Sequence, residues 1–237
     1  MTADGRTLVI AHRTCPLDAP ENSREGIATA ARLGADLVEI DVRPARDGVP
    51  VLSHDTTVRR VTGRRRRVRW TASTRLTGLA LLGADEPLPS LADALAVLPD
   101  GLDLAVDVKD GRAMAAAIEV LAAHGMLDRA RLWSGDRRAV AVADAEAPGG
   151  ERAFLRNTET EAAALAYLDD AVAVGATAVS VMDVSLTPAV VAAGHERGLT
   201  VHCWVRTLDA QAPVLACRPD GVVTDFPAEA RRAIDGA

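Results

Sequence analysis

Short apolar runs alternate with longer helix-forming segments along this 237-residue chain, and the alternation constrains the fold more than any other feature. Strands are expected at residues 7–11, 37–42, 102–108, 131–133, 152–155, 177–182, 200–204 and 221–224. Helices are expected at residues 22–33, 90–98, 112–124, 136–145, 159–174, 187–197, 208–215 and 227–234. Regular alternation of this kind is typical of a parallel sheet covered by helices.

The number of strand–helix units predicts an α/β fold of one particular kind, a closed (β/α)8 TIM barrel, which takes about 250 residues. The alternative is an open doubly wound sheet, which usually has fewer units and a glycine-rich turn after its first strand. Here the first predicted strand runs into His-Arg-Thr-Cys-Pro, which contains no glycine. Because no linker separates two regions, we expect a single domain over residues 1–237.

Charge and composition narrow the range of partners. The formal net charge of -6 argues against general binding to nucleic acid or to an anionic membrane. The chain has no run of about 20 apolar residues and no signal-peptide pattern, so we expect no stable membrane insertion. Three cysteines without metal-type spacing fit a reduced, cytoplasmic protein. The composition leaves the oligomeric state open.

An arginine-rich segment, residues 64–69 followed by Trp70, stands out in this acidic chain. It could be a patch that binds nucleic acid or phosphate. It could also be a solvated, mobile loop, which the mutual repulsion of clustered like charges favours. We therefore predict a loop.

Polar residues gather where the predicted strands end, which is where (β/α)8 barrels place their active sites. Glu39 and Asp41 are two residues apart on one strand, so their side chains share a face. The same spacing holds for Asp107 and Lys109. The full set of unusual polar or aromatic residues near strand ends is His12, Arg13, Glu39, Asp41, His54, Asp107, Lys109, Trp204 and Asp225.

Three inward carboxylates, Glu39, Asp41 and Asp107, form an all-oxygen ligand set, which suits one divalent cation, Mg²⁺ or Ca²⁺, rather than Zn²⁺. Such a cation would relieve a repulsion on the order of 4 kcal/mol per close pair. The alternative is that each acid pairs with a nearby arginine or with Lys109, the only lysine among 27 basic residues. Keeping one ammonium in an arginine-rich chain indicates a site that needs a compact charge.

Two histidines, His12 and His54, would then be free for proton transfer, because histidine titrates near neutral pH. The alternative is that both ligate a metal. Arg13, Lys109 and a cation would form a cup for a phosphate, and Trp204 would offer a flat wall to a small alcohol. The other histidines, His124, His195 and His202, are expected to be structural.

Several short motifs occur together in a fixed order. They are His12-Arg13, Pro20-Glu21-Asn22, Gly34-Ala35-Asp36, Glu39-x-Asp41, Asp47-Gly48, His54-Asp55, Asp107-x-Lys109, Trp204 and Thr224-Asp225. In this order the chain resembles the glycerophosphodiester phosphodiesterase family. The resemblance implies a TIM barrel that hydrolyses glycerophosphodiesters, a small-molecule substrate class, to sn-glycerol 3-phosphate and an alcohol.

The resemblance also implies a role for each motif residue. Glu39, Asp41 and Asp107 would bind the divalent metal, and His12 and His54 would be the general base and acid. Arg13 and Lys109 would hold phosphate oxygens. Glu21 and Asn22 would brace the substrate site, and Trp204 would line the glycerol pocket.

The chain departs from the family pattern at three places. Thr14 stands where the family usually has glycine, and since threonine adopts positive φ only at a cost, we expect a different loop path there. Asp107 replaces the usual glutamate and is one methylene shorter. Arg206 lies in a run that follows Trp204 and could alter head-group choice.

Two other functions stay open: a lyase that releases a cyclic phosphate from lysophospholipids, and a barrel that binds phosphodiesters without turnover.

Overall fold

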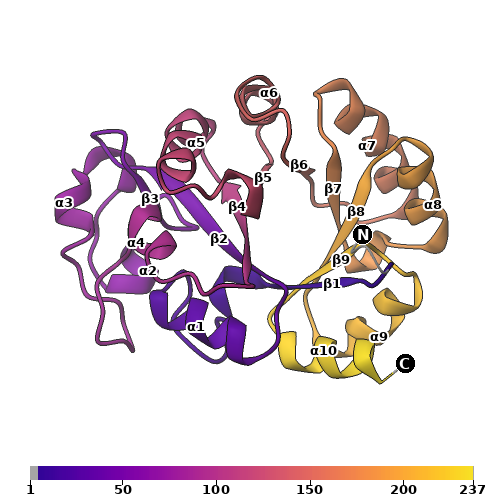
Figure 1. Ribbon diagram of the computed structural model, residues 1–237, viewed down its shortest axis with the longest axis horizontal. Coiled ribbons are helices and arrows are strands. Elements are labelled where there is room, and N and C mark those ends of the chain that lie inside the picture. Colours follow the sequence, from indigo (N-terminus) through magenta and orange to yellow (C-terminus); the bar gives the residue numbers. More distant parts are fainter. Residues whose placement is uncertain (1–4, 237) are drawn as a thin grey trace.

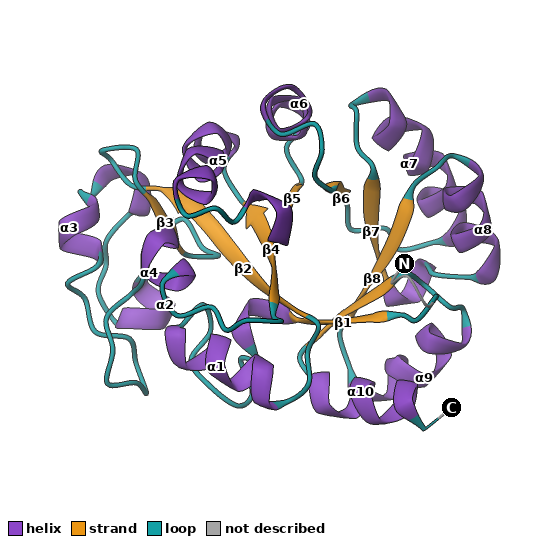
Figure 2. Cartoon of the chain, in the orientation of Figure 1, coloured by secondary structure: helices purple, strands orange, loops and turns teal. Residues whose placement is uncertain are grey.

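A closed barrel of eight parallel strands forms the centre of the computed structural model, which describes residues 5–236 (Figures 1 and 2). The strands are β1 (Leu8–Ala11), β2 (Leu37–Pro44), β4 (Asp103–Val108), β5 (Ala130–Ser134), β6 (Arg152–Leu155), β7 (Ala178–Met182), β8 (Thr200–Val205) and β9 (Gly221–Thr224). The barrel closes because β1 pairs in parallel with both β2 and β9. A short strand, β3 (Pro50–Leu52), is added antiparallel to the end of β2. The predicted (β/α)8 fold is confirmed.

Helices surround the barrel, one after almost every strand. They are α1 (Arg24–Arg32), α4 (Leu91–Leu95), α5 (Met114–Ala123), α6 (Arg137–Glu146), α7 (Glu161–Ala173), α8 (Pro188–Glu196), α9 (Leu208–Ala216) and α10 (Pro227–Asp235). Side-chain caps fix the starts of several of these helices: Ser23 accepts a hydrogen bond from the amide of Gly26, and Ser90 forms a capping box with Asp93. The helix expected at residues 90–98 is shorter than predicted and ends at Leu95.

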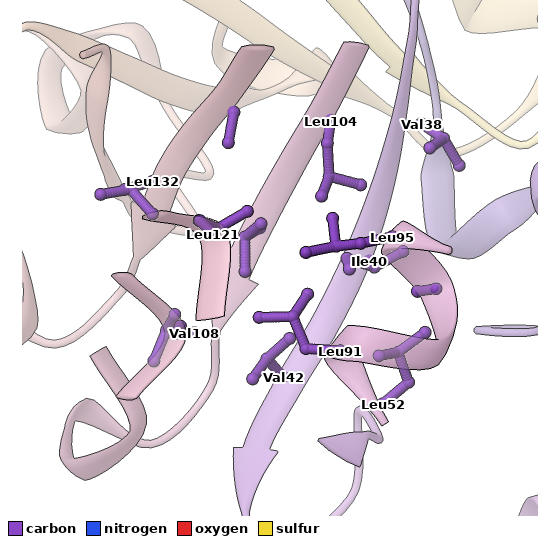
Figure 3. Close-up of a cluster of buried hydrophobic side chains, with 14 of the residues drawn as sticks. Val38, Ile40, Val42, Leu52, Leu91, Leu95, Leu104, Val108, Leu121 and Leu132 are labelled. Carbon is purple, nitrogen blue, oxygen red and sulfur yellow. The ribbon is translucent and has the colours of Figure 1, made fainter. Parts of the chain in front are cut away.

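The main core lies between the outer face of the strands and the helices (Figure 3). Val38, Ile40 and Val42 of β2 point outward and are fully buried against α4 and α5. Burial of each such side chain contributes about 1.5–3 kcal/mol. Because side chains alternate along a strand, this outward apolar row forces Glu39 and Asp41 to point into the barrel.

A polar cluster fills the barrel interior near its N-terminal end. Nε2 of His202, a fully buried residue, lies 3.0 Å from Oε1 of Glu151, and Nε1 of Trp133 donates to the same oxygen at 3.0 Å. Burial disfavours the charge on Glu151, but His202 and Arg131 outweigh it and hold the pKa of this carboxyl at about 2. The structure thus places His202 in the barrel core. His195 bonds to Asp220, and His124 to the carbonyl of Val120.

The segment between β2 and α4, which includes β3, is an insertion with its own small core, in which Val51, Val58, Val68, Leu76 and Leu88 are buried. It contains α2 (Arg59–Thr62), a 3-10 turn at Val68–Trp70 and α3 (Ser73–Leu76). The predicted loop at residues 64–69 is therefore part of a folded unit: its arginines are exposed, but Val68 is buried and its amide donates to the carbonyl of Thr56. None of the helices within residues 5–236 is long and apolar enough to cross a membrane.

Candidate active site

Three carboxylates converge inside the barrel at the C-terminal ends of β2 and β4. Asp41 and Asp107 are register partners on these neighbouring strands, and Glu39 lies two residues before Asp41 on the same inward face. All three are buried, and one oxygen from each lies within 4.8 Å of the others. The sequence-based expectation that these acids share one site therefore agrees with their placement.

The turn after β1 brings its backbone against this cluster. The amide of Arg13 donates to Oε2 of Glu39 at 2.7 Å. To do so the chain takes three consecutive left-handed residues, Arg13, Thr14 and Cys15, with φ of 45°, 63° and 64°. The expectation that Thr14 avoids positive φ is wrong. The Thr14 hydroxyl accepts a hydrogen bond from the buried amide of Ser23, a contact that glycine could not make and that helps to hold this strained turn.

The start of α1 is adapted to this turn. A Cβ at Gly26 would lie 2.2 Å from Oγ1 and 2.3 Å from the carbonyl oxygen of Thr14, so only glycine fits there. The next segment closes the turn, because the amide of Asn22 donates to the carbonyl of Arg13 at 2.9 Å. The side chain of Asn22 donates to Oδ2 of Asp41 and accepts from its amide, both at 2.8 Å. Asn22 thus fixes the orientation of the Asp41 carboxylate.

Two cations meet the carboxylates. The ammonium of Lys109 lies 2.9 Å from Oδ1 of Asp41 and bonds to Oδ2 of Asp107, and Nε of Arg13 lies 3.3 Å from Oδ2 of Asp41. This is the ion pairing that the sequence left open as an alternative to a metal. It is incomplete, since Oδ1 of Asp107 is buried without a hydrogen-bond partner among the described residues, and three acids face two cations.

The electrostatics differ among the three acids. Burial and the neighbouring Asp41 raise the pKa of Glu39 well above its usual value, and burial raises the pKa of Asp107. For Asp41 burial is outweighed by Lys109 and Arg13, so its pKa is lowered. The pKa of Lys109 is raised, because the attraction of the carboxylates exceeds the cost of its burial. The site carries excess negative potential, which a further cation would relieve.

The donor set fits a divalent cation. It consists only of carboxylate oxygens, close together and partly unpartnered, as hard cations such as Mg²⁺ and Ca²⁺ prefer. No cysteine or histidine belongs to this cluster within residues 5–236, and the three cysteines are free thiols. Glu39, Asp41 and Asp107 are therefore the residues that could hold a metal.

Each of the two candidate histidines is bonded through Nδ1 to a carboxylate. Nδ1 of His12 lies 2.7 Å from Oδ1 of Asp225, and Nδ1 of His54 lies 2.8 Å from Oδ1 of Asp55. A carboxylate on Nδ1 orients the ring and leaves Nε2 for other partners. The His12 ring lies 5.7 Å from the ring of Trp204.

A pocket of about 500 Å³ opens at this end of the barrel. Its wall includes both histidines and most of the other predicted site residues: His12, Arg13, Glu39, His54, Asp107, Lys109 and Trp204. Asp41 and Asn22 are buried behind this wall. Glu21 pairs with Arg60 and does not line the pocket, and Arg206 pairs with Asp183 at 2.8 Å, also outside it. Glu21 and Asn22 thus support the wall from behind.

Two partners were not assigned a role from sequence. Asp225 was noted as a residue after the last strand and as part of a motif, and Arg60 was given no role. Arg60 bonds to Asp55 and Glu21 and so ties the insertion to the turn after β1. The position of Asp225 after the last strand was the available signal, because barrel closure places β9 beside β1.

The fold and this site define a class, the (β/α)8-barrel phosphodiesterases. Comparison with known proteins agrees. The sequence profile of the Glycerophosphoryl diester phosphodiesterase family matches residues 12–229. The chain is 30% identical over 237 aligned residues to "Probable glycerophosphodiester phosphodiesterase 2" of Mycobacterium tuberculosis, covering 93% of this chain and 88% of that protein. The chain therefore belongs to the glycerophosphoryl diester phosphodiesterase family, and the resemblance seen in its motifs is confirmed.

Other relatives match in part or in fold. Glycerophosphodiester phosphodiesterase 1 of Rattus norvegicus is 53% identical over 57 residues, which is 24% of this chain and 17% of that one. An Oleispira antarctica phosphodiesterase, solved with the product sn-glycerol-3-phosphate, superposes with a TM-score of 0.87 at 24% identity and 98% coverage of both chains. A glycerophosphodiester phosphodiesterase from Agrobacterium tumefaciens gives 0.82 at 21% identity, covering 98% of this chain and 100% of that one. These structures share the barrel fold.

Proposed function

We propose that this chain hydrolyses glycerophosphodiesters to sn-glycerol 3-phosphate and an alcohol. The observation that carries the proposal is one pocket lined by two carboxylate-bonded histidines, by Arg13 and Lys109, and by two of the three clustered acids. Family membership supports the substrate class, and so does the product bound to the structurally similar Oleispira antarctica enzyme. The three free cysteines support a cytoplasmic location for the single domain.

Glu39, Asp41 and Asp107 would hold one divalent cation, Mg²⁺ or Ca²⁺. When bound, this cation supplies positive charge beside the phosphoryl oxygens. Arg13 and Lys109 hold further phosphate oxygens, with the ammonium of Lys109 acting as a compact charge. Asn22 and Glu21 keep the wall in place, Asn22 through Asp41 and Glu21 through Arg60.

The histidines move protons. His12, held by Asp225, accepts a proton at Nε2 from the nucleophile. The nucleophile is water, or it is a hydroxyl of the glycerol that displaces the alcohol and forms a cyclic phosphate, which water then opens to glycerol 3-phosphate. His54, held by Asp55, donates a proton from Nε2 to the leaving alkoxide. The carboxylate on each ring stabilises the imidazolium form that occurs during the cycle. Trp204 packs beside His12 and offers an apolar face to the glycerol moiety.

A coupled assay tests the proposal. With glycerophosphocholine and Mg²⁺ or Ca²⁺, the wild type should release glycerol 3-phosphate, and a chelator should stop the release. His12→Ala and His54→Ala should each lower kcat by about 10²–10⁴-fold while the protein stays folded. Phosphorus NMR of the products distinguishes glycerol 3-phosphate from a cyclic phosphate. Unchanged turnover in either variant would remove that histidine from the mechanism, and no turnover with any metal would contradict the proposed activity.

A further inference from the structure

The insertion concentrates positive charge in an otherwise acidic protein. Residues 46–75 contain nine arginines and two acidic residues, although the whole chain has a net charge of -6. The two acids are occupied, because Asp47 accepts hydrogen bonds from Ser73 and Asp55 bonds to His54 and Arg60. The overall charge therefore conceals a local patch of opposite sign, and patches of this kind govern what approaches a surface.

Most of these arginines have no acidic partner. Arg60 is the exception, since it pairs with Glu21 and Asp55. The other eight, all exposed, form no ion pair with a carboxylate among residues 5–236: Arg46, Arg59, Arg64, Arg65, Arg66, Arg67, Arg69 and Arg75. Elsewhere in the chain many arginines are paired, for example Arg24 with Glu86. Unpaired guanidinium groups held close together repel one another and are suited to polyanionic surfaces.

The backbone holds this charge in a defined arrangement. Thr57 and Arg67 form an antiparallel bridge, and the amide of Val58 donates to the carbonyl of Arg66 at 3.0 Å. Val68 is buried in the small core of the insertion, which anchors the segment between Arg67 and Arg69. In Figure 1 the insertion projects at the left edge, around α3 and α2. Because the insertion projects from the barrel, its exposed arginines can contact a flat surface such as a membrane.

A hollow of about 210 Å³ lies within the patch. It is lined by three arginines, Arg46, Arg66 and Arg75, together with Trp70, Thr71 and Ala72. A hollow with three guanidinium groups suits a phosphate group. Trp70 is 67% exposed, and the guanidinium of Arg69 lies 5.7 Å from the centre of its ring. Leu82, 59% exposed, lies beside Gly63 at the start of the arginine run.

We propose that this patch is a docking surface for a membrane that contains anionic phospholipids, with a lipid phosphate in the hollow and Trp70 at the interface. Clusters of four to eight basic residues are typical of surfaces that bind anionic lipid, and exposed tryptophan prefers the boundary between head groups and acyl chains. A single-stranded nucleic acid would instead need several aromatic platforms, and the insertion contains one. The protein would bind this membrane peripherally, because none of the helices in the described part of the chain could cross the bilayer.

Docking and catalysis involve different residues. The arginine patch belongs to the insertion, which begins beyond the C-terminal end of β2 and is tied to the turn after β1 through Arg60. A docked enzyme would keep its pocket near the bilayer from which deacylated phospholipids arise. This inference does not require the proposed hydrolysis, because vesicle binding is measured without turnover.

The test is co-sedimentation of the full chain with vesicles of phosphatidylcholine alone and of phosphatidylcholine mixed with phosphatidylglycerol. The wild type should bind the mixed vesicles and lose binding as salt is added, while neutral vesicles leave it in the supernatant. Replacing three patch arginines together, Arg65→Gln, Arg66→Gln and Arg67→Gln, should weaken partitioning about fivefold per residue and about a hundredfold in total. Hydrolysis of soluble glycerophosphocholine by this variant should match the wild type.

A matched control removes the same charge elsewhere. Arg32, Arg138 and Arg218 are exposed and form no ion pair within residues 5–236, so the triple glutamine variant at these positions should bind vesicles like the wild type. Equal loss in both triple variants would show that only net charge matters and would overturn the docking surface. So would wild-type binding that does not distinguish anionic from neutral vesicles.

Tryptophan fluorescence gives a direct readout of the contact. Emission should shift to shorter wavelength on anionic vesicles, and Trp70→Phe should abolish the shift, because Trp133 is buried in the barrel and Trp204 lies in the wall of the active-site pocket. A shift that persists in Trp70→Phe would contradict the placement of Trp70. If a short single-stranded oligonucleotide binds more tightly than vesicles at equal phosphate concentration, the patch is a nucleic-acid surface and the membrane proposal fails. Capture of inorganic phosphate without vesicle binding would also overturn it.

Discussion

Lys109→Met is the perturbation that most directly tests how the acidic cluster is stabilised. The ammonium lies between Asp41 and Asp107, and its side chain is 22% exposed. Methionine has a similar length but carries no charge. The variant would leave the guanidinium of Arg13 as the one cation, among the described residues, beside three buried carboxyl groups, and this guanidinium pairs with Asp41. The folded state must then either keep an uncompensated charge or take up a proton.

Two independent considerations set the magnitude. Removing one partner of a buried ion pair typically costs about 3–5 kcal/mol. Taking up one proton on a carboxyl that ordinarily titrates near pH 4 costs about 4 kcal/mol at pH 7, at about 1.4 kcal/mol per pH unit. Both values agree, so we expect the free energy of unfolding to fall by about 4 kcal/mol at neutral pH, which lowers Tm by about 8–16 °C in a domain of this size.

The pH dependence follows from the direction of the pKa shift. Without Lys109 the pKa of a cluster carboxyl rises in the folded state, so the folded variant binds one more proton than the unfolded chain. Its stability relative to the wild type therefore decreases by about 1.4 kcal/mol for each pH unit of increase, and the difference shrinks as the pH falls toward the ordinary pKa of the carboxyl. The variant should be closest to the wild type under acidic conditions.

Urea unfolding in the presence of a chelator, repeated at about pH 6 and about pH 8, measures this effect. Arg112→Met is the control, since Arg112 pairs with Asp110 at the surface and its loss should leave stability unchanged. Adding Mg²⁺ or Ca²⁺ should stabilise Lys109→Met more than the wild type, because the cation replaces the missing charge. Parallel pH profiles for variant and wild type would refute the reasoning, as would a loss no larger than that of the control.

Three further predictions concern one residue of the barrel core and two residues near the site. Glu151→Gln should lower stability by about 3 kcal/mol above pH 4.5, because the pKa of Glu151 is lowered to about 2. This difference should vanish as the pH falls toward 2, which urea unfolding across that range can show. Gly26→Ala should be destabilising, since a clash with Thr14 costs about 1–3 kcal/mol and exceeds the gain of about 1 kcal/mol in helix propensity; an equal or higher Tm would contradict this. Asp225→Asn should lower kcat and shift the pH–rate profile by altering His12, whereas an unchanged profile would mean that Asp225 is only structural.

The alternation of apolar runs and helix-forming segments was enough to predict the barrel. The fold depends on which side chains are buried, and the spacing of apolar residues in the sequence reveals these side chains. The same logic predicted the inward face of β2. Outward Val38, Ile40 and Val42 must pack against helices, so Glu39 and Asp41 have no other direction to take. Asp107 follows from the register of β2 with β4. These features follow from the geometry of strands, so they can be predicted without knowledge of side-chain contacts.

The features that sequence reasoning missed oppose local propensity or depend on contacts distant in sequence. The turn at Arg13, Thr14 and Cys15 is left-handed, although a β-branched residue disfavours positive φ. The turn is held by the Arg13–Glu39 hydrogen bond and by the amide of Ser23, neither of which a local pattern reveals. The folded state of the arginine segment was missed for a related reason, since like charges predict a loop whereas buried Val68 anchors a defined structure.

The pairing of His12 with Asp225 is intermediate between the features that the sequence predicts and those that it does not. The two residues are 213 positions apart in the chain. It is not predictable from either neighbourhood alone. Once the barrel is taken as closed, however, β1 must pair with β9, and the register places Ala11 opposite Thr224. The residues that follow these partners are His12 and Asp225, so both leave the sheet at the same level and on adjacent strands. A parallel barrel thus turns two unrelated strand ends into neighbours, and the orientation of His12 is a consequence of closure rather than of the local sequence around it.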